Sequence, residues 1–163
     1  MTKRCNFRYT GDLVLGMHDA LVEITGIIAG LTFAIENNRV IVMTGIIASV
    51  AASLSMAAAN YMAQRTEDNP DAARCAMYTG IMYIGTSAAI IAPFVFIDNR
   101  FWALGAMGAI AITIIFLFNL VTRCASTRPF LVRFIEMLSV CTAVSGASFI
   151  IGILAKHFLG VDV

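Results

Sequence analysis

The chain has 163 residues, of which 60% are hydrophobic and 13% are charged, and its formal net charge is +1 at pH 7. Soluble globular proteins carry about 25% charged residues, so this composition excludes a soluble domain and indicates an integral membrane protein. The net charge gives no sign of a polyanionic partner, and we expect no binding of nucleic acid.

Five apolar runs are long enough to cross the hydrocarbon layer of a bilayer, which takes about 20 residues in a helix. The segments between them are short, and strand-type alternation is absent, so only a bundle of helices satisfies the backbone in lipid. We therefore predict an all-α, polytopic membrane protein with a single transmembrane domain over residues 1–163. The predicted helices cover residues 13–35, 40–63, 77–97, 101–121 and 134–159.

The basic N-terminal segment has no short apolar core followed by a cleavage site, so we predict no removable signal peptide. Lys and Arg are unevenly distributed over the two ends of the predicted helices. This bias favours a cytoplasmic N-terminus and an exported C-terminus, and the compact length favours the plasma membrane of a prokaryote. Eight lie on the side of the N-terminus (Lys3, Arg4, Arg8, Arg65, Arg74, Arg123, Arg128 and Arg133), and three lie on the other (Arg39, Arg100 and Lys156).

Motifs of catalysis and of structural metal sites are absent from the sequence. No HExxH, GxSxG or phosphate-binding loop occurs. The four cysteines, Cys5, Cys75, Cys124 and Cys141, form no CxxC pair, and we expect neither a disulfide nor a zinc site. We therefore expect a protein that is not an enzyme and has no prosthetic group.

The first predicted helix carries two acids, Asp19 and Glu23, one helical turn apart near its centre. A carboxylate at this depth costs about 2.5–3.5 kcal/mol on insertion scales. Ionisable residues in membrane helices mark ion paths or proton relays. We therefore assign Asp19 and Glu23 to a cation-binding site.

One stripe of the same helix combines acids with glycines at spacings of three and four residues. Glycines let a second helix approach closely in lipid, so we predict that Gly16, Gly26 and Gly30 pack against neighbours while the acids face a gap. The stripe consists of Asp12, Gly16, Asp19, Glu23, Gly26 and Gly30.

The second predicted helix has a weaker polar stripe, formed by Ser49, Ser53, Met56 and Asn60. A methionine thioether beside carboxylates suits a transition metal such as Fe(II) better than Mg²⁺. A methionine such as Met56 is on its own more often a residue that fills the core, so its assignment to a metal site depends on the neighbouring acids.

Near the start of the last predicted helix, Glu136 follows Arg133 by three residues. Two interpretations stay open for Glu136: a local ion pair with Arg133, or a metal ligand at the mouth of a path.

Two runs resemble the helix signatures of the vacuolar iron transporter family. Residues 12–34 read DLVLGMHDALVEITGIIAGLTFA and are similar to the first signature, in which D-[AG]-L-V follows an L-G turn and precedes G-x-x-A-G. Residues 51–63 read AASLSMAAANYMA and resemble the second, which ends L-S-M-A-x-x-x-Y.

The resemblance implies a homodimer of five-helix subunits that exports Fe(II), or a similar divalent metal such as Mn(II), from the cytosol in exchange for protons. It places the path between the first and second helices along the dimer axis. Asp19 and Met56 of both subunits then form the metal site, because a two-fold axis duplicates every ligand. The residues expected to line the path are Asp12, Ser53, Asn60 and Glu136.

The sequence also departs from the family pattern. Asn60 and Ser53 stand where acids are common, Ala20 stands where Gly is common, and Glu23 stands where a small hydroxyl residue is usual. We expect Glu23 to restore the lost negative charge from the opposite wall. The segment 64–76 is too short for the metal-collecting domain of eukaryotic relatives. A membrane protein that binds metal or assembles with a partner, without transport, is therefore the alternative.

Overall fold

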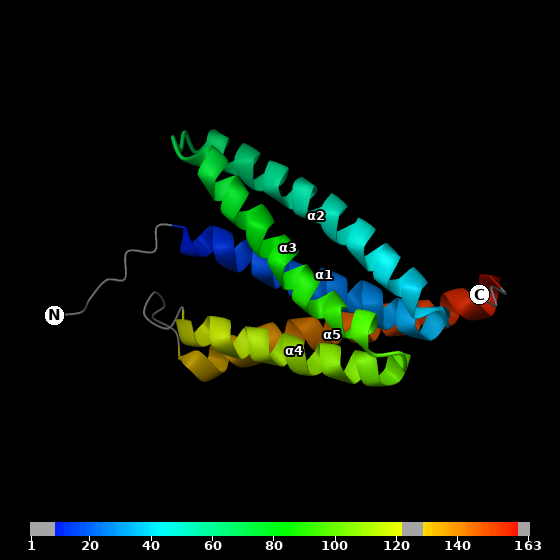
Figure 1. The fold of residues 1–163 in the computed structure, drawn as a ribbon. Coiled ribbons are helices and arrows are strands. Elements are labelled where there is room, and N and C mark those ends of the chain that lie inside the picture. The colour runs from blue at the N-terminus through cyan, green and yellow to red at the C-terminus, as the bar shows by residue number, and fades with distance from the viewer. Residues whose placement is uncertain (1–8, 122–128, 160–163) are drawn as a thin grey trace.

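The computed structural model describes residues 9–121 and 129–159, and this part of the chain forms five long helices (Figure 1). All five are long and apolar enough to cross a membrane. The predicted all-α architecture of a multi-pass membrane protein is therefore confirmed. The helices are α1 (Thr10–Ala34), α2 (Asn38–Thr66), α3 (Ala72–Phe96), α4 (Arg100–Val121) and α5 (Phe130–Leu159).

The helices extend beyond the predicted apolar runs, most clearly at their N-terminal ends. α3 begins at Ala72 instead of residue 77, and α5 begins at Phe130 instead of residue 134. Hydropathy marks the residues that fit the hydrocarbon layer, whereas a helix continues as long as its backbone hydrogen bonds do. The parts of the orientation and cysteine predictions that fall on Lys3, Arg4, Cys5, Arg8, Arg123, Cys124, Arg128 and the side chain of Lys156 lie outside the described residues.

α1 is the central helix of the bundle, and it contacts each of the other four. In Figure 1, α2 and α3 lie on one side of α1, and α4 and α5 lie on the other. The apolar side chains of α1 form the middle of the core, where Met17, Leu21 and Ile24 are 0% exposed. Because so much of its circumference is covered, the polar side chains of α1 must be accommodated between helices.

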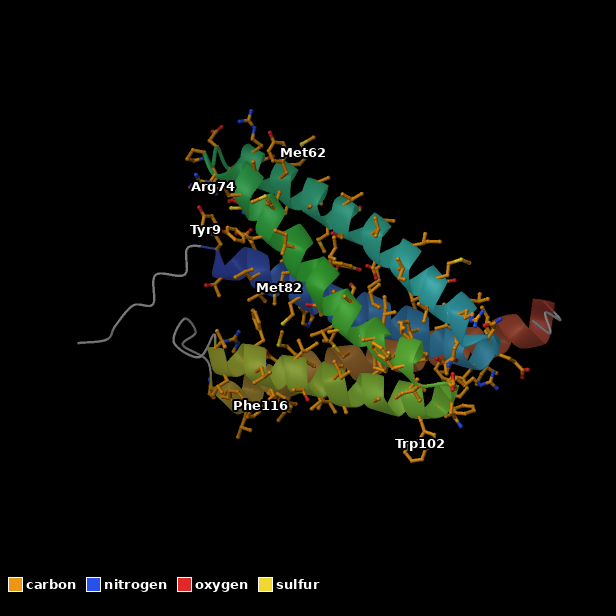
Figure 2. The ribbon with its side chains drawn as sticks, viewed as in Figure 1. Tyr9, Met62, Arg74, Met82, Trp102 and Phe116 are labelled. Carbon is orange, nitrogen blue, oxygen red and sulfur yellow. The ribbon has the colours of Figure 1, made fainter. Side chains whose placement is uncertain are left out.

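The outer faces of the bundle carry large apolar side chains. Met62 on α2 is 66% exposed and Trp102 on α4 is 75% exposed, and both point away from the helices in Figure 2. Such surfaces favour association or aggregation in water, whereas in a bilayer they contact lipid chains of the same polarity. The distribution of apolar side chains thus agrees with the composition.

Glycines bring the backbones of α3 and α5 against α1. A Cβ at Gly16 would overlap the carbonyl oxygen of Thr79 on α3. On the α5 side, a Cβ at Gly152 would lie 2.6 Å from the carbonyl oxygen of Gly30, and Gly26 also faces α5. The three glycines that were predicted to pack against neighbouring helices therefore all lie at a helix–helix contact.

The connection between α2 and α3 is a short turn that its backbone hydrogen bonds define. The amide of Asn69 donates to the carbonyl of Gln64 (3.0 Å), and the amide of Asp68 donates to the carbonyl of Arg65 (3.1 Å). These two bonds form a Schellman motif, which needs a left-handed residue after the helix. Asp68 takes that conformation with a φ of 53°. The turn fixes the end of α2 against the start of α3.

The contact at Gly16 generates a prediction about stability. We expect Gly16→Ala to push α3 away from α1 and to lower the free energy of unfolding by about 1–3 kcal/mol, the usual cost of overpacking. Gly85 on α3 is the matched control, since a Cβ there would meet nothing within 4 Å. Gly85→Ala should leave stability unchanged or raise it slightly, because alanine favours the helix.

The measurement is thermal unfolding of each purified variant in detergent, followed by circular dichroism. Equal midpoints for Gly16→Ala and Gly85→Ala would show that the close approach of α3 does not depend on Gly16.

Candidate functional site

Glu23 on α1 is bonded to α3 by a tyrosine. The hydroxyl of Tyr83 donates a hydrogen bond of 2.7 Å to Oε2 of Glu23. Tyr83 is 0% exposed, whereas Glu23 is partly buried. The buried hydroxyl needs a partner and the carboxylate needs a donor, so each residue lowers the cost of placing the other inside the bundle.

Asp19 lies one turn before Glu23 and is also partly buried. Its carboxylate experiences the negative charge of Glu23, as expected for residues four apart on a helix. Among the described residues, no side chain or amide donates a hydrogen bond to Asp19 and no Lys or Arg forms an ion pair with it. Asp19 and Glu23 therefore differ: among the described residues, Tyr83 donates a hydrogen bond to Glu23, whereas Asp19 has only an attractive electrostatic interaction with the neighbouring His18.

The α2 residues of the predicted site have separate surroundings. Ser53 is 2% exposed, and its hydroxyl donates to the carbonyl of Gly80 on α3 (3.1 Å). Met56 is partly buried and packs against the edge of the apolar core, so part of its side chain remains accessible from outside the protomer. Ser53 thus acts as a contact between α2 and α3, whereas Met56 remains available to a ligand or a second chain.

Asp12 and Asn60 form a polar junction with Thr79 where α1, α2 and α3 meet. The side-chain amide of Asn60 donates to Oδ1 of Asp12 (2.8 Å) and to the hydroxyl of Thr79 (2.7 Å). Asp12 is 8% exposed, Asn60 6% and Thr79 0%. An acid at position 60 would have no hydrogen to donate to Asp12, so asparagine suits this junction for a direct chemical reason.

Within the protomer, Asn60 and Glu23 lie at different depths, and the compensation of Asn60 and Ser53 by Glu23 stays a prediction. Asn60 contacts Asp12, and Asp12 precedes Glu23 by eleven residues on α1. At a rise of 1.5 Å per residue, this spacing corresponds to about 16 Å along the helix. The two positions are therefore at different depths and not opposite one another.

Glu136 is exposed near the start of α5, where its backbone carbonyl accepts a hydrogen bond from the hydroxyl of Ser139 (2.9 Å). The acids of α1 that were predicted as site residues fall into two groups at different depths, Asp12 in one and Asp19 with Glu23 in the other.

Two residues of these groups were not predicted as site residues from the sequence. Tyr83 and Thr79 are both buried polar residues of α3 that complete the polar contacts of α1. Both are hydrogen-bonding side chains that are 0% exposed in a membrane helix. Exposure cannot be read from the sequence, so these two residues could not be singled out there.

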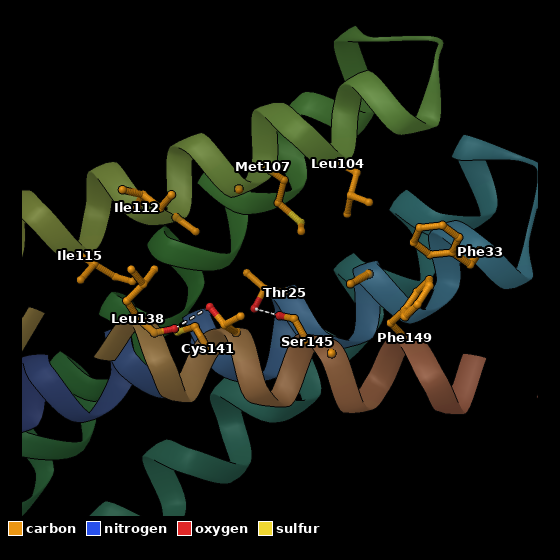
Figure 3. Close-up of a pocket in the computed structure, with 15 residues that line it drawn as sticks. Thr25, Phe33, Leu104, Met107, Ile112, Ile115, Leu138, Cys141, Ser145 and Phe149 are labelled. Carbon is orange, nitrogen blue, oxygen red and sulfur yellow. Dashed lines mark hydrogen bonds between the residues drawn. The ribbon is translucent and has the colours of Figure 1, made fainter. Parts of the chain in front are cut away.

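A cavity of about 510 Å³ lies on the other side of α1, between α1, α4 and α5 (Figure 3). Its walls are mainly apolar, with Phe33 and Leu104 among them. The hydroxyl of Ser145 donates to that of Thr25 (3.3 Å), which in turn donates to the carbonyl of Leu21. No acidic residue lines this cavity, so it offers no charge to a cation.

The polar residues of α1 and α2 coincide with a family match. A model of the VIT family, which is the family that the two helix signatures resemble, matches residues 10–74. This segment comprises α1, α2 and the start of α3, and it includes Asp12, Asp19, Glu23, Met56 and Asn60. The chain matches no curated protein. Over its first two helices and the start of the third, the chain is therefore similar to the VIT family.

Proposed function

We propose that the protein transports a divalent transition metal, Fe(II) or Mn(II), out of the cytosol in exchange for protons. The VIT family match indicates metal-ion transport across a membrane, and the five apolar helices provide the spanning body. The observation that carries the proposal is Asp19, a partly buried carboxylate in the central helix with no hydrogen-bonding partner among the described residues. A cation is the partner that such a carboxylate lacks.

The ion requires more ligands than one protomer supplies. Among the residues that the structure describes, no three His, Cys, Asp or Glu side chains come together. Asp19 and Met56 are both partly buried, as expected of residues that a second copy covers. A two-fold axis beside α1 and α2 would combine two carboxylates with two thioethers. This mixed set of oxygen and sulfur ligands favours Fe(II) or Mn(II) over Mg²⁺.

Proton exchange follows from competition for the same carboxylate oxygens. Metal binding requires deprotonated ligands, so a cation that binds two carboxylic acids displaces their protons. Protons that return from the other side of the membrane then release the metal. Glu23 lies one turn from Asp19, where the hydroxyl of Tyr83 holds its carboxylate against α3. Glu23 can therefore take up a proton or attract the ion without changing the packing of α1.

The alternative is a membrane protein that binds metal, or assembles with a partner, without transport. One observation favours it: α2 ends at Thr66 and α3 begins at Ala72, so there is no room between them for a metal-collecting domain. Purified protein in sealed liposomes separates the two functions, because only a transporter produces metal-dependent flux.

The first prediction of the transport proposal concerns Asp19. We expect Asp19→Asn to lower Fe(II) and Mn(II) flux into proteoliposomes by at least about tenfold, since a hydrogen bond or ion contact to a charged group contributes about 1.5–3 kcal/mol. Asp98→Asn is the matched control, because Asp98 is exposed in the turn before α4. Chemical cross-linking checks that both variants assemble as the parent does. Unchanged flux in Asp19→Asn would remove this carboxylate from the path.

The second prediction concerns the selectivity that Met56 provides. Met56→Leu keeps the volume of the side chain and removes its sulfur, so we expect the ratio of Fe(II) to Mn(II) flux to fall severalfold. Met62→Leu is the control, because Met62 is 66% exposed on the outer face of α2. The measurement is a competition assay with both metals. If the ratio stays the same in Met56→Leu, the thioether is a packing group.

The third prediction concerns the bond between Tyr83 and Glu23. We expect Tyr83→Phe to reduce flux in the parent protein but to have no further effect in a Glu23→Gln background, because the hydroxyl acts only through the carboxylate. Tyr61→Phe on α2, whose ring is 39% exposed, serves as the control. Additive losses in the double variant would mean that Tyr83 and Glu23 act independently.

A further inference from the structure

We propose that each protomer holds a second cation site, in the polar pocket beside Asp12, which receives a hydrated divalent cation before it reaches Asp19. This role as a receiving site rests on the transport function proposed above. The pocket itself lies within one protomer, so cation binding there does not depend on a dimer axis.

The pocket is formed where α1 begins, α2 ends and α3 begins. It has a volume of about 360 Å³, and its lining includes Tyr9, Asp12, Asn60, Gln64 and Asn69. Tyr9 marks this end of the bundle in Figure 2. The Schellman turn after α2 holds the lining together on one side, because the side-chain amide of Asn69 donates to Oε1 of Gln64 (2.5 Å). Hydrogen bonds within the turn therefore fix the residues that line this side of the pocket.

Asp12 brings a nearly buried negative charge to this pocket. Its Oδ1 accepts the bond from Asn60, whereas its Oδ2 accepts none from any described residue. No Lys or Arg forms an ion pair with Asp12 among the same residues. Its place in the first turn of α1 gives some support from the helix dipole. That support is small beside the cost of a buried carboxylate without a counter-charge, so the pocket favours a cation.

The side-chain oxygen of Asn60 is a second potential ligand in the same pocket. Both hydrogens of its side-chain amide are used, one toward Asp12 and one toward Thr79. Its Oδ1 is therefore the polar atom left for the pocket, and no described residue donates to it. Asn60 is 6% exposed as a residue, but its Oδ1 is not fully buried and can face the pocket that the residue lines. The same amide that fixes Asp12 thus presents a neutral oxygen beside it.

One carboxylate oxygen and one amide oxygen in a roomy polar pocket suit a divalent cation that keeps most of its water. Oxygen-only ligands do not select strongly among Mn²⁺, Mg²⁺ and Fe²⁺. A site with a single charge also binds weakly, because affinity for hard cations rises with the number of charged ligands. These properties fit a receiving site, whereas the metal site proposed above at Asp19 and Met56 provides the selective step.

The test measures Mn²⁺ binding to purified protein in detergent by the loss of the paramagnetic signal of free Mn²⁺. The background is Asp19→Asn, so that the site near the centre of α1 does not contribute. We expect one weak site per protomer to remain in this background, to disappear in Asp12→Asn with Asp19→Asn, and to persist in the control Asp98→Asn with Asp19→Asn. Absence of the site in Asp19→Asn alone, or its survival without the Asp12 carboxylate, would overturn the proposal.

A variant that binds Mn²⁺ more tightly provides a second test, because misfolding lowers the affinity of a site and does not raise it. Asn60→Asp keeps the size of the side chain and adds a second carboxylate to the pocket, but it removes the amide that donates to Asp12 and Thr79. A bound cation takes the place of that amide between the two carboxylates, so we expect Mn²⁺ to bind at least about tenfold more tightly to variant protein that circular dichroism shows to be folded. Mn²⁺ should also raise the unfolding temperature of this variant more than that of the parent. Unchanged or weaker affinity in Asn60→Asp would contradict a site at this position. Because all of these measurements are of binding, a protein that binds here but shows no flux would refute transport and leave the site intact.

Discussion

The close approach of α3 to α1 at Gly16 is the constraint on which the polar interior depends. The missing side chain lets the carbonyl of Thr79 reach the backbone of α1, and the two polar groups lie on either side of this point. Before it along α1, Asp12 meets Asn60 and Thr79; after it, Glu23 meets Tyr83. A wider spacing between the helices would break both groups and leave buried polar atoms without partners, which costs more in a membrane interior than in water.

The two polar groups satisfy their carboxylates to the same extent. The buried hydroxyl of Tyr83 donates to one oxygen of Glu23, and the amide of Asn60 donates to one oxygen of Asp12. Between the two groups, Asp19 has no hydrogen-bond donor among the described residues. The central helix thus carries carboxylate oxygens without a described donor at three levels. In the transport function proposed above, a cation would meet several weak partners along α1, which favours movement over tight retention.

The sequence predicts the five helices, the central acids and the packing glycines, because each depends on residues within a few turns of one another. Hydrogen-bond partners on different helices cannot be predicted in this way. Tyr83 is 60 residues from Glu23, and Asn60 is 48 residues from Asp12. No local spacing encodes such pairs, so the sequence indicates a missing charge at Asn60 but not the amide bond that replaces it. The relative depth of residues on different helices is likewise not visible in the sequence, so the different levels of Asn60 and Glu23 could not be predicted.

The cavity between α1, α4 and α5 makes the packing around α1 uneven. At Gly16 on the α3 side and at Gly30 on the α5 side, backbone meets backbone without intervening side chains, and close-packed protein of this kind is nearly incompressible. Toward α4, by contrast, the walls enclose about 510 Å³ of space. A small movement of α4 against α1 therefore meets less resistance than a movement of α3 or α5 against the same helix.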